Sequence, residues 1–434
     1  MIQSLHILQD CAYFLTAVLL CLLSAIILQH KKNRSQGSDP SLGEAKKKAK
    51  DRSSGGKLIE WTPIDFKYPA ITPCNMELAD IKPIPYRPFR WGPYHVTMGI
   101  RSMNWDDWIE LDNQYDRYQR IRAHRILTRD EKVVRVLDDI PRVVRGGGQA
   151  AIELVHELAE YLSKRYPLSF RVTRHSPETR SKCQFGWEGA PPIKTITVVP
   201  LNATHELPLD LHDGECAAKR AMTISALLVQ DDLAIMIEGR DGRHYFQAGA
   251  ICVPGFWQME HKIGKTLDEI HLSGHVPQYQ EKLQPSLERF FRRLSVDKPV
   301  VRNNYFIQLV GSRSDEKLDP DELAWSYTTN GPEDGFEHGD RFAPHDRPEP
   351  RPEILRLRTE RQTLRRLPKS GAVIFTIRTY VVPIEELVKE AGVAGRLASA
   401  IESWPDEVVE YKGRERLGWR RTLMEYLERN DDIG

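Results

Sequence analysis

The feature that most constrains this chain is an uncharged apolar run near its N-terminus. Residues 11–28 read CAYFLTAVLLCLLSAIIL and contain no charged residue and no proline. At about 1.5 Å per residue, the run makes a helix about 27 Å long, enough for a thin bilayer. A cleaved signal peptide is the alternative, but no basic segment precedes the run and no small-residue cleavage site follows it. The run therefore predicts a transmembrane anchor within residues 1–30.

Basic residues flank this run only on its C-terminal side, beginning with Lys31, Lys32 and Arg34. The positive-inside rule then places the rest of the chain in the cytosol, and the short span suits the endoplasmic reticulum membrane. Residues 31–57 are polar and rich in Ser, Gly and Lys, which predicts a flexible basic linker. The cysteines beyond the run are scattered and form no CxxC, as expected of free thiols in a reducing compartment.

The remaining residues, 58–434, are predicted to form a soluble α+β domain with an antiparallel sheet and packed helices. A net charge of +1, from 62 basic and 61 acidic residues, gives no support for nucleic-acid binding. The predicted strands are 221–229, 233–237, 244–253, 303–310 and 372–382. The predicted helices begin at Asn104 or cover 150–166, 266–270 and 280–294. A surface loop is predicted at 331–352.

Common catalytic motifs are absent. The segment ending in Gly264-Lys265-Thr266 lacks the first glycine of a phosphate-binding loop, because position 259 is Met, and no GxGxxG or GxSxG occurs. His271 and His275 have a zinc-binding spacing, but helix-breaking residues lie between and after them. The sequence therefore gives little support for nucleotide-binding or classical hydrolase chemistry.

Short blocks in a fixed order resemble one family. They are Arg87–Phe89, Met98–Ile100, Trp108–Asp112, Gln230–Leu233, Ala248–Pro254, Lys262–Gly264, Glu269–His271, Val276–Pro277, Glu281–Leu283, Arg289–Phe291, Glu360–Pro368, Ser370–Val373 and Ile377–Tyr380. Together they resemble the haem-binding (alpha) subunit of haem-dependent oxidative N-demethylases, formerly a domain of unknown function. The resemblance covers residues 80–395. One departure is that Leu272–His275 separates the histidine from the Val-Pro pair.

The resemblance implies a PAS-like fold that holds haem b and oxidises a secondary amine with O2, releasing formaldehyde from an N-methyl group. It also implies electron-donating flavin and iron–sulfur partner subunits. We therefore expect a membrane-anchored haem-dependent monooxygenase or N-demethylase acting on an amine or another small organic molecule. The alternatives are a non-catalytic haem or small-ligand sensor with a PAS-like fold, and a scaffold that has lost the cofactor.

His271 is the predicted haem-iron ligand, because it is the histidine inside a matching block and imidazole is a common axial ligand. It ends a short predicted helix, so it could instead bond only the last helical carbonyls. His261 and His275 are the reserve candidates. His244 is expected to be an ordinary surface residue of a strand.

Arginines and carboxylates in the matching blocks supply the other candidates. Arg361 and Arg365, on a predicted helix, and Arg378, in a predicted strand, are expected to bind the haem propionates. Arg378 could equally project to solvent. Glu269 and Glu360 could hold a substrate ammonium, or be ion-paired structural residues.

Aromatic residues beside the predicted sheet are the candidates for the walls of the cofactor pocket. Trp257 and Phe256 could line it, or could belong to the core.

Overall fold

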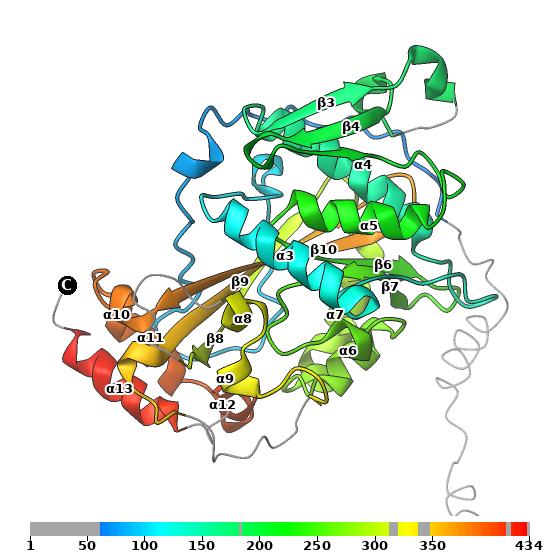
Figure 1. Ribbon diagram of the computed structural model, residues 1–434. Coiled ribbons are helices and arrows are strands. Elements are labelled where there is room, and N and C mark those ends of the chain that lie inside the picture. Colours follow the sequence, from blue (N-terminus) through cyan, green and yellow to red (C-terminus); the bar gives the residue numbers. More distant parts are fainter. Residues whose placement is uncertain (1–60, 182–184, 312–319, 337–347, 414–417, 432–434) are drawn as a thin grey trace, which may run out of the picture. The chain divides into compact units, whose positions relative to one another are not determined.

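A seven-stranded antiparallel sheet lies at the centre of this computed structural model, which describes residues 61–181, 185–311, 320–336, 348–413 and 418–431 (Figure 1). Its strand order is β1-β8-β9-β10-β6-β7-β2. Its strands are β1 (Arg101–Ser102), β2 (Val134–Val136), β6 (Asp232–Glu238), β7 (His244–Ala250), β8 (Val300–Leu309), β9 (Leu355–Arg366) and β10 (Val373–Pro383). A second sheet contains β3 (Phe170–Arg174), β4 (Ile193–Val198) and β5 (Ala203–Glu206).

Strand β9 is central and governs which side chains can meet. It pairs with β8 on one side and β10 on the other, and nearly all of its residues are buried. Alternate side chains of a strand point to opposite faces of the sheet. Glu360, Gln362 and Leu364 therefore lie on one face, and Arg361 and Arg365 lie on the other.

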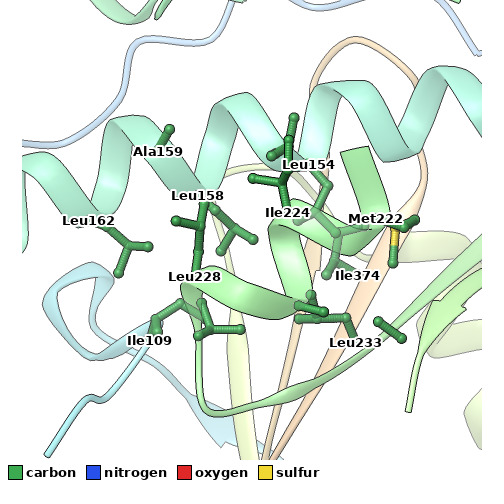
Figure 2. Close-up of a cluster of buried hydrophobic side chains, with 14 of the residues drawn as sticks. Ile109, Leu154, Leu158, Ala159, Leu162, Met222, Ile224, Leu228, Leu233 and Ile374 are labelled. Carbon is green, nitrogen blue, oxygen red and sulfur yellow. The ribbon is translucent and has the colours of Figure 1, made fainter. Parts of the chain in front are cut away.

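Helices α4 (Gly148–Arg165) and α5 (Ala217–Leu228) cover the face that carries Arg361 and Arg365 (Figure 1). Alanine, methionine and leucine make α5 a good helix former, and its residues spaced three and four apart are buried. Figure 2 shows the resulting core, which joins both helices to β6 and β10 through Leu154, Leu158, Leu162, Met222, Ile224, Leu228, Leu233 and Ile374. Helix α3 (Tyr115–Arg129) packs against α5.

Helices α6 (Leu267–Ser273) and α7 (Gln284–Arg293) pack over the opposite face of the sheet. A separate core lies where β8 and β9 meet the C-terminal helices α10 (Ile384–Leu387), α11 (Val393–Glu402), α12 (Asp406–Gly413) and α13 (Trp419–Arg429). The short helices α8 (Pro320–Ala324) and α9 (Tyr327–Asn330) follow β8 in the chain. The two faces of the large sheet are thus covered by different sets of helices.

Buried ion pairs tie the α4–α5 face together. Arg378 donates to Asp112 at 2.8 Å, and the exposed fractions of these side chains are 0% and 4%. Arg365 pairs with Glu157 of α4 in the same way. Removing one partner of such a pair leaves a buried charge unpaired, so these arginines are needed by the fold.

The structure confirms part of the predicted secondary structure and corrects the rest. Strands β6, β7, β8 and β10 and helices α4, α6 and α7 lie where they were predicted. The predicted strand 221–229 is wrong, because most of it belongs to helix α5. The helix predicted from Asn104 is a single 3-10 turn, Trp105–Asp107, and α3 begins only at Tyr115. The segment with Arg361 and Arg365 is strand β9 rather than a helix, because pairing on both sides overrides its helix-forming composition.

The predicted fold class is also corrected. What the structure supports is a mixed α/β protein with a large antiparallel sheet of seven strands, wider than the five strands predicted from the sequence. None of the helices in the described part of the chain has the length and apolar character required to cross a bilayer. The predicted anchor at 11–28 and the linker at 31–57 lie outside the described residues, as do residues 337–347 of the predicted loop. The transmembrane helix and the single-pass localisation therefore have no structural support.

We predict that Arg378→Met lowers the free energy of unfolding by about 3–5 kcal/mol, because it leaves the Asp112 carboxylate buried without its cation. Urea unfolding of the purified full chain measures this loss. Arg429→Met is the control, since Arg429 forms an exposed pair with Glu425 at 3.5 Å and should cost less than about 0.5 kcal/mol. Equal losses in the two variants would show that Arg378 has no structural role.

Candidate functional site

A cavity lies between the sheet face that carries Glu360 and helices α6, α7 and α12. Its volume is about 290 Å³, counted as the space that the centre of a water molecule can occupy. This is near the lower end of the range for small-molecule sites. Its walls are mainly apolar and include Ala234, Met236, Phe246, Ile270, Leu287, Phe290, Leu364 and Phe375. The polar side chains that line this apolar space define its chemistry.

His271 of α6 lines the cavity. The helix begins with a capping box in which the Thr266 hydroxyl accepts from the Glu269 amide and the Glu269 carboxylate accepts from the Thr266 amide. One turn on, Nδ1 of His271 donates to the Leu267 carbonyl oxygen at 2.6 Å. This bond fixes the proton on Nδ1 and leaves the Nε2 lone pair free. Nε2 has no hydrogen-bond partner within the described part of the chain.

The ring of His271 is held between aromatic side chains. Tyr279 stacks on it with ring centroids 4.7 Å apart and ring planes 9° apart, and Trp257 meets it edge to face at 5.8 Å. Tyr279 begins a π-helical turn, a feature frequent at functional sites. Gly274 ends α6, where a Cβ atom would come within 2.5 Å of the Trp257 ring. Glycine at this position therefore allows Trp257 to pack against the helix.

His271 is a neutral imidazole under ordinary conditions. Burial, together with the nearby charges of Arg302 and Lys262, lowers its pKa to about 4, although the hydrogen bond to the Leu267 carbonyl opposes the shift. Lys262 lies over the Trp257 ring at 4.7 Å and donates to the Ile270 carbonyl at 3.3 Å. A neutral histidine whose other nitrogen is already bonded is the form that binds a metal.

Two cationic side chains, Arg302 and Lys412, also line the cavity. Arg302 of β8 faces Gln362 of β9 and lines the cavity, and its Nε atom is buried. Among the described residues its guanidinium has no hydrogen-bond acceptor and no ion-pair partner within 4.0 Å. Lys412 of α12 donates to Asn304 Oδ1 at 3.2 Å and to the Tyr305 carbonyl at 3.3 Å. Burial lowers the pKa of Lys412 to about 7 and also lowers the pKa of Arg302.

Glu360 is the cavity carboxylate that is left without a cation. It accepts from Gln362 Nε2 at 3.0 Å and from Asn304 Nδ2 at 3.4 Å, and no ion pair to it is found among the described residues. The other lining carboxylate, Asp232, is already paired with Arg122 at 2.7 Å. Glu360 therefore offers a negative charge to a bound molecule, whereas Asp232 does not.

The three arginines predicted to bind propionates lie away from the cavity. Arg361, Arg365 and Arg378 are buried on the opposite face of the sheet, where they pair with Glu110, Glu157 and Asp112. The physical reason is that alternate side chains of a strand point to opposite faces of the sheet. Each of these arginines occupies a strand position that points toward α4 and α5. The propionate assignment of these residues is therefore corrected.

The other predicted residues divide between cavity, capping and surface. Trp257 and Phe256 line the cavity, as does Glu360. Glu269 is exposed and closes the capping box of α6, so its position is structural. His261 and His275 are exposed and do not line the cavity.

His244 corrects another expectation. It is 3% exposed rather than on the surface, and its ring meets Phe291 edge to face.

Arg302 and Lys412 were missed by sequence reasoning. The signal for Arg302 was weak but present, since it follows two valines in a strand that continues into a buried apolar run. Its place opposite Gln362 becomes visible only when β8 and β9 are paired. Lys412 had no signal, because helix α12 reaches the cavity from residues far along the chain.

Comparison with known families gives one match that covers most of the chain. The model of a family described as haem-dependent oxidative N-demethylase, alpha subunit-like, matches residues 99–423. The match includes β6 to β10, α6, α7 and α12. It therefore contains the polar lining residues His271, Arg302, Glu360 and Lys412. It also extends beyond residue 395, where the block resemblance ended.

Proposed function

Because the chain belongs to the haem-dependent oxidative N-demethylase, alpha subunit-like family, whose cofactor is haem, we propose that it binds haem in this cavity and oxidises a small N-methylated amine. The observation that carries the proposal is the His271 imidazole. It is neutral, its Nδ1 proton is committed to the Leu267 carbonyl, and Nε2 is left for the cavity. We assign His271 as the axial ligand of the haem iron.

The residues present fit a porphyrin. The space beside His271 has apolar and aromatic walls, which suit a flat hydrophobic macrocycle. Trp257 and Phe256 supply part of these walls, and their rings meet edge to face at 6.4 Å. No described carboxylate approaches His271 in hydrogen-bond range, so the imidazole is oriented by a backbone carbonyl instead. His271 thus offers the haem iron one neutral nitrogen ligand, its Nε2 atom.

When bound, haem would supply the oxidative chemistry of the N-demethylation that gives the family its name. The chain's own residues would hold and position the amine. An ammonium needs a carboxylate, and Glu360 is the lining carboxylate without a cation. Its hydrogen bonds from Gln362 and Asn304 orient the carboxylate toward the cavity. We propose that Glu360 binds the substrate ammonium, while the apolar walls exclude water from the N-methyl group.

The family is that of an alpha subunit, which is consistent with a partner subunit. We propose that this partner is an electron-donating protein carrying flavin and iron–sulfur groups. A reconstituted activity should therefore require a separate reductase.

We predict that the purified full chain takes up haem with a Soret band that shifts on adding carbon monoxide. His271→Ala should remove or strongly change this band, because the iron loses its nitrogen ligand. Absorption spectra after haem titration measure the effect. His275→Ala is the matched control, since His275 lies four residues away and outside the cavity, and its spectrum should equal that of the unchanged protein. A wild-type protein that binds no haem, or an unchanged spectrum for His271→Ala, would contradict the assignment.

We predict that Glu360→Gln weakens binding of N-methylated secondary amines by about tenfold or more, because a neutral amide cannot pair with an ammonium. Dimethylamine, the smallest such amine, is the first probe, and its spectral titration against the haem-loaded protein gives the affinity. Glu269→Gln is the control, because Glu269 lies outside the cavity. Unchanged amine binding in Glu360→Gln would exclude this role. Bound haem without any substrate-dependent oxygen uptake, in the presence of a competent reductant, would favour a non-catalytic haem protein.

A further inference from the structure

We propose that Arg302 and Lys412, which both line the cavity, form a carboxylate-binding site. The haem propionates are one source of that carboxylate, and the carboxylate of a zwitterionic N-methyl amino acid is the other. The inference rests on the proposed function where haem is the source. The carboxylate site itself stands on the geometry of the two cations.

Arg302 differs from the other buried arginines of this protein. Arg122, Arg365 and Arg378 each pair with a carboxylate, and Arg358 donates to the Val253 carbonyl at 2.9 Å. Arg302 has none of these acceptors among the described residues, although its Nε atom is buried. The residue as a whole is half-buried, and arginine keeps its charge in proteins, so a guanidinium that lines the cavity without an acceptor offers that charge to an anion from outside the chain. Its planar fork suits a carboxylate.

Lys412 adds a second positive charge beside Arg302. Its ammonium is within hydrogen-bond distance of two oxygens, those of Asn304 and Tyr305, which leaves one N–H for a ligand. It also lies over the Tyr305 ring at 4.5 Å. The charged groups that face it are Arg302 and Glu360. The two cations, Arg302 and Lys412, and the one carboxylate, Glu360, leave this part of the cavity with an excess of positive charge. A carboxylate ligand would balance that charge.

The direct test compares haem with haem dimethyl ester, which has the same ring but no free propionate. If propionates occupy the site, the full-length protein binds haem at least about tenfold more tightly than the ester. Arg302→Gln then lowers haem affinity by about ten- to a hundredfold and leaves ester affinity unchanged. Arg302→Lys restores part of the loss. Arg101→Gln is the control, because Arg101 lies one strand away, is exposed and bonds Asn303 at 2.5 Å.

The second arm tests a substrate carboxylate. Calorimetric titration with sarcosine and with dimethylamine compares two amines that differ by one carboxylate. If haem and its ester bind alike but sarcosine binds more tightly than dimethylamine in an Arg302-dependent way, the substrate is the source. If neither haem nor sarcosine binding depends on Arg302, the carboxylate site is excluded. A protein that binds no haem would overturn the proposed function alone, because the sarcosine arm can still be read.

Lys412 gives this site a pH dependence. With its pKa near 7 in the ligand-free protein, carboxylate affinity should be highest below pH 7 and fall as pH rises, by at most about tenfold per unit. Lys412→Arg should flatten this profile, because arginine stays charged. Lys262, whose pKa burial lowers to about 8, is present in both proteins, so its titration cancels in the comparison. The same pH slope in both proteins would show that Lys412 does not contact the carboxylate.

Discussion

The two-residue period of strand β9 is the constraint on which the rest of the structure depends. Because β9 is paired on both sides and covered on both faces, each of its side chains must satisfy one of two different environments. On one face, Arg361 pairs with Glu110 of the segment before α3, and Arg365 pairs with Glu157 of α4. On the other face, Glu360 and Gln362 line the cavity. A shift of one residue in register would turn Glu360 and Gln362 toward the packed core and turn Arg361 and Arg365 toward the cavity.

The same division separates stability from function. The face toward α4 and α5 is closed by packed apolar side chains and paired charges, as Figure 2 illustrates for its apolar part. The face toward α6 and α7 keeps a space whose polar groups are incompletely paired, namely Nε2 of His271, the Arg302 guanidinium and the Glu360 carboxylate. These residues are half-buried, and polar groups withdrawn from water without full pairing are costly, so their concentration around one cavity supports a ligand that pairs with them.

Sequence reasoning succeeded where local pattern and block order were sufficient. It identified the family and four strands of the large sheet. Three of the residues that it proposed for the site, His271, Trp257 and Glu360, line the cavity, and their roles stay predictions. It failed where the answer depended on pairing between distant segments. Arg361 and Arg365 are four residues apart, which suggested one helix face, and only the placement of β9 between β8 and β10 reveals their true direction. Lys412 reaches the cavity from a C-terminal helix that no short-range pattern connects to it.

The most direct test of the central claim is an experimental structure of the haem-loaded full chain. The account predicts that the iron is bound by Nε2 of His271 and that the porphyrin fills the space between α6, α7 and the Glu360 face of the sheet. Haem bound by another residue, or a cavity closed by protein side chains with haem elsewhere, would contradict it.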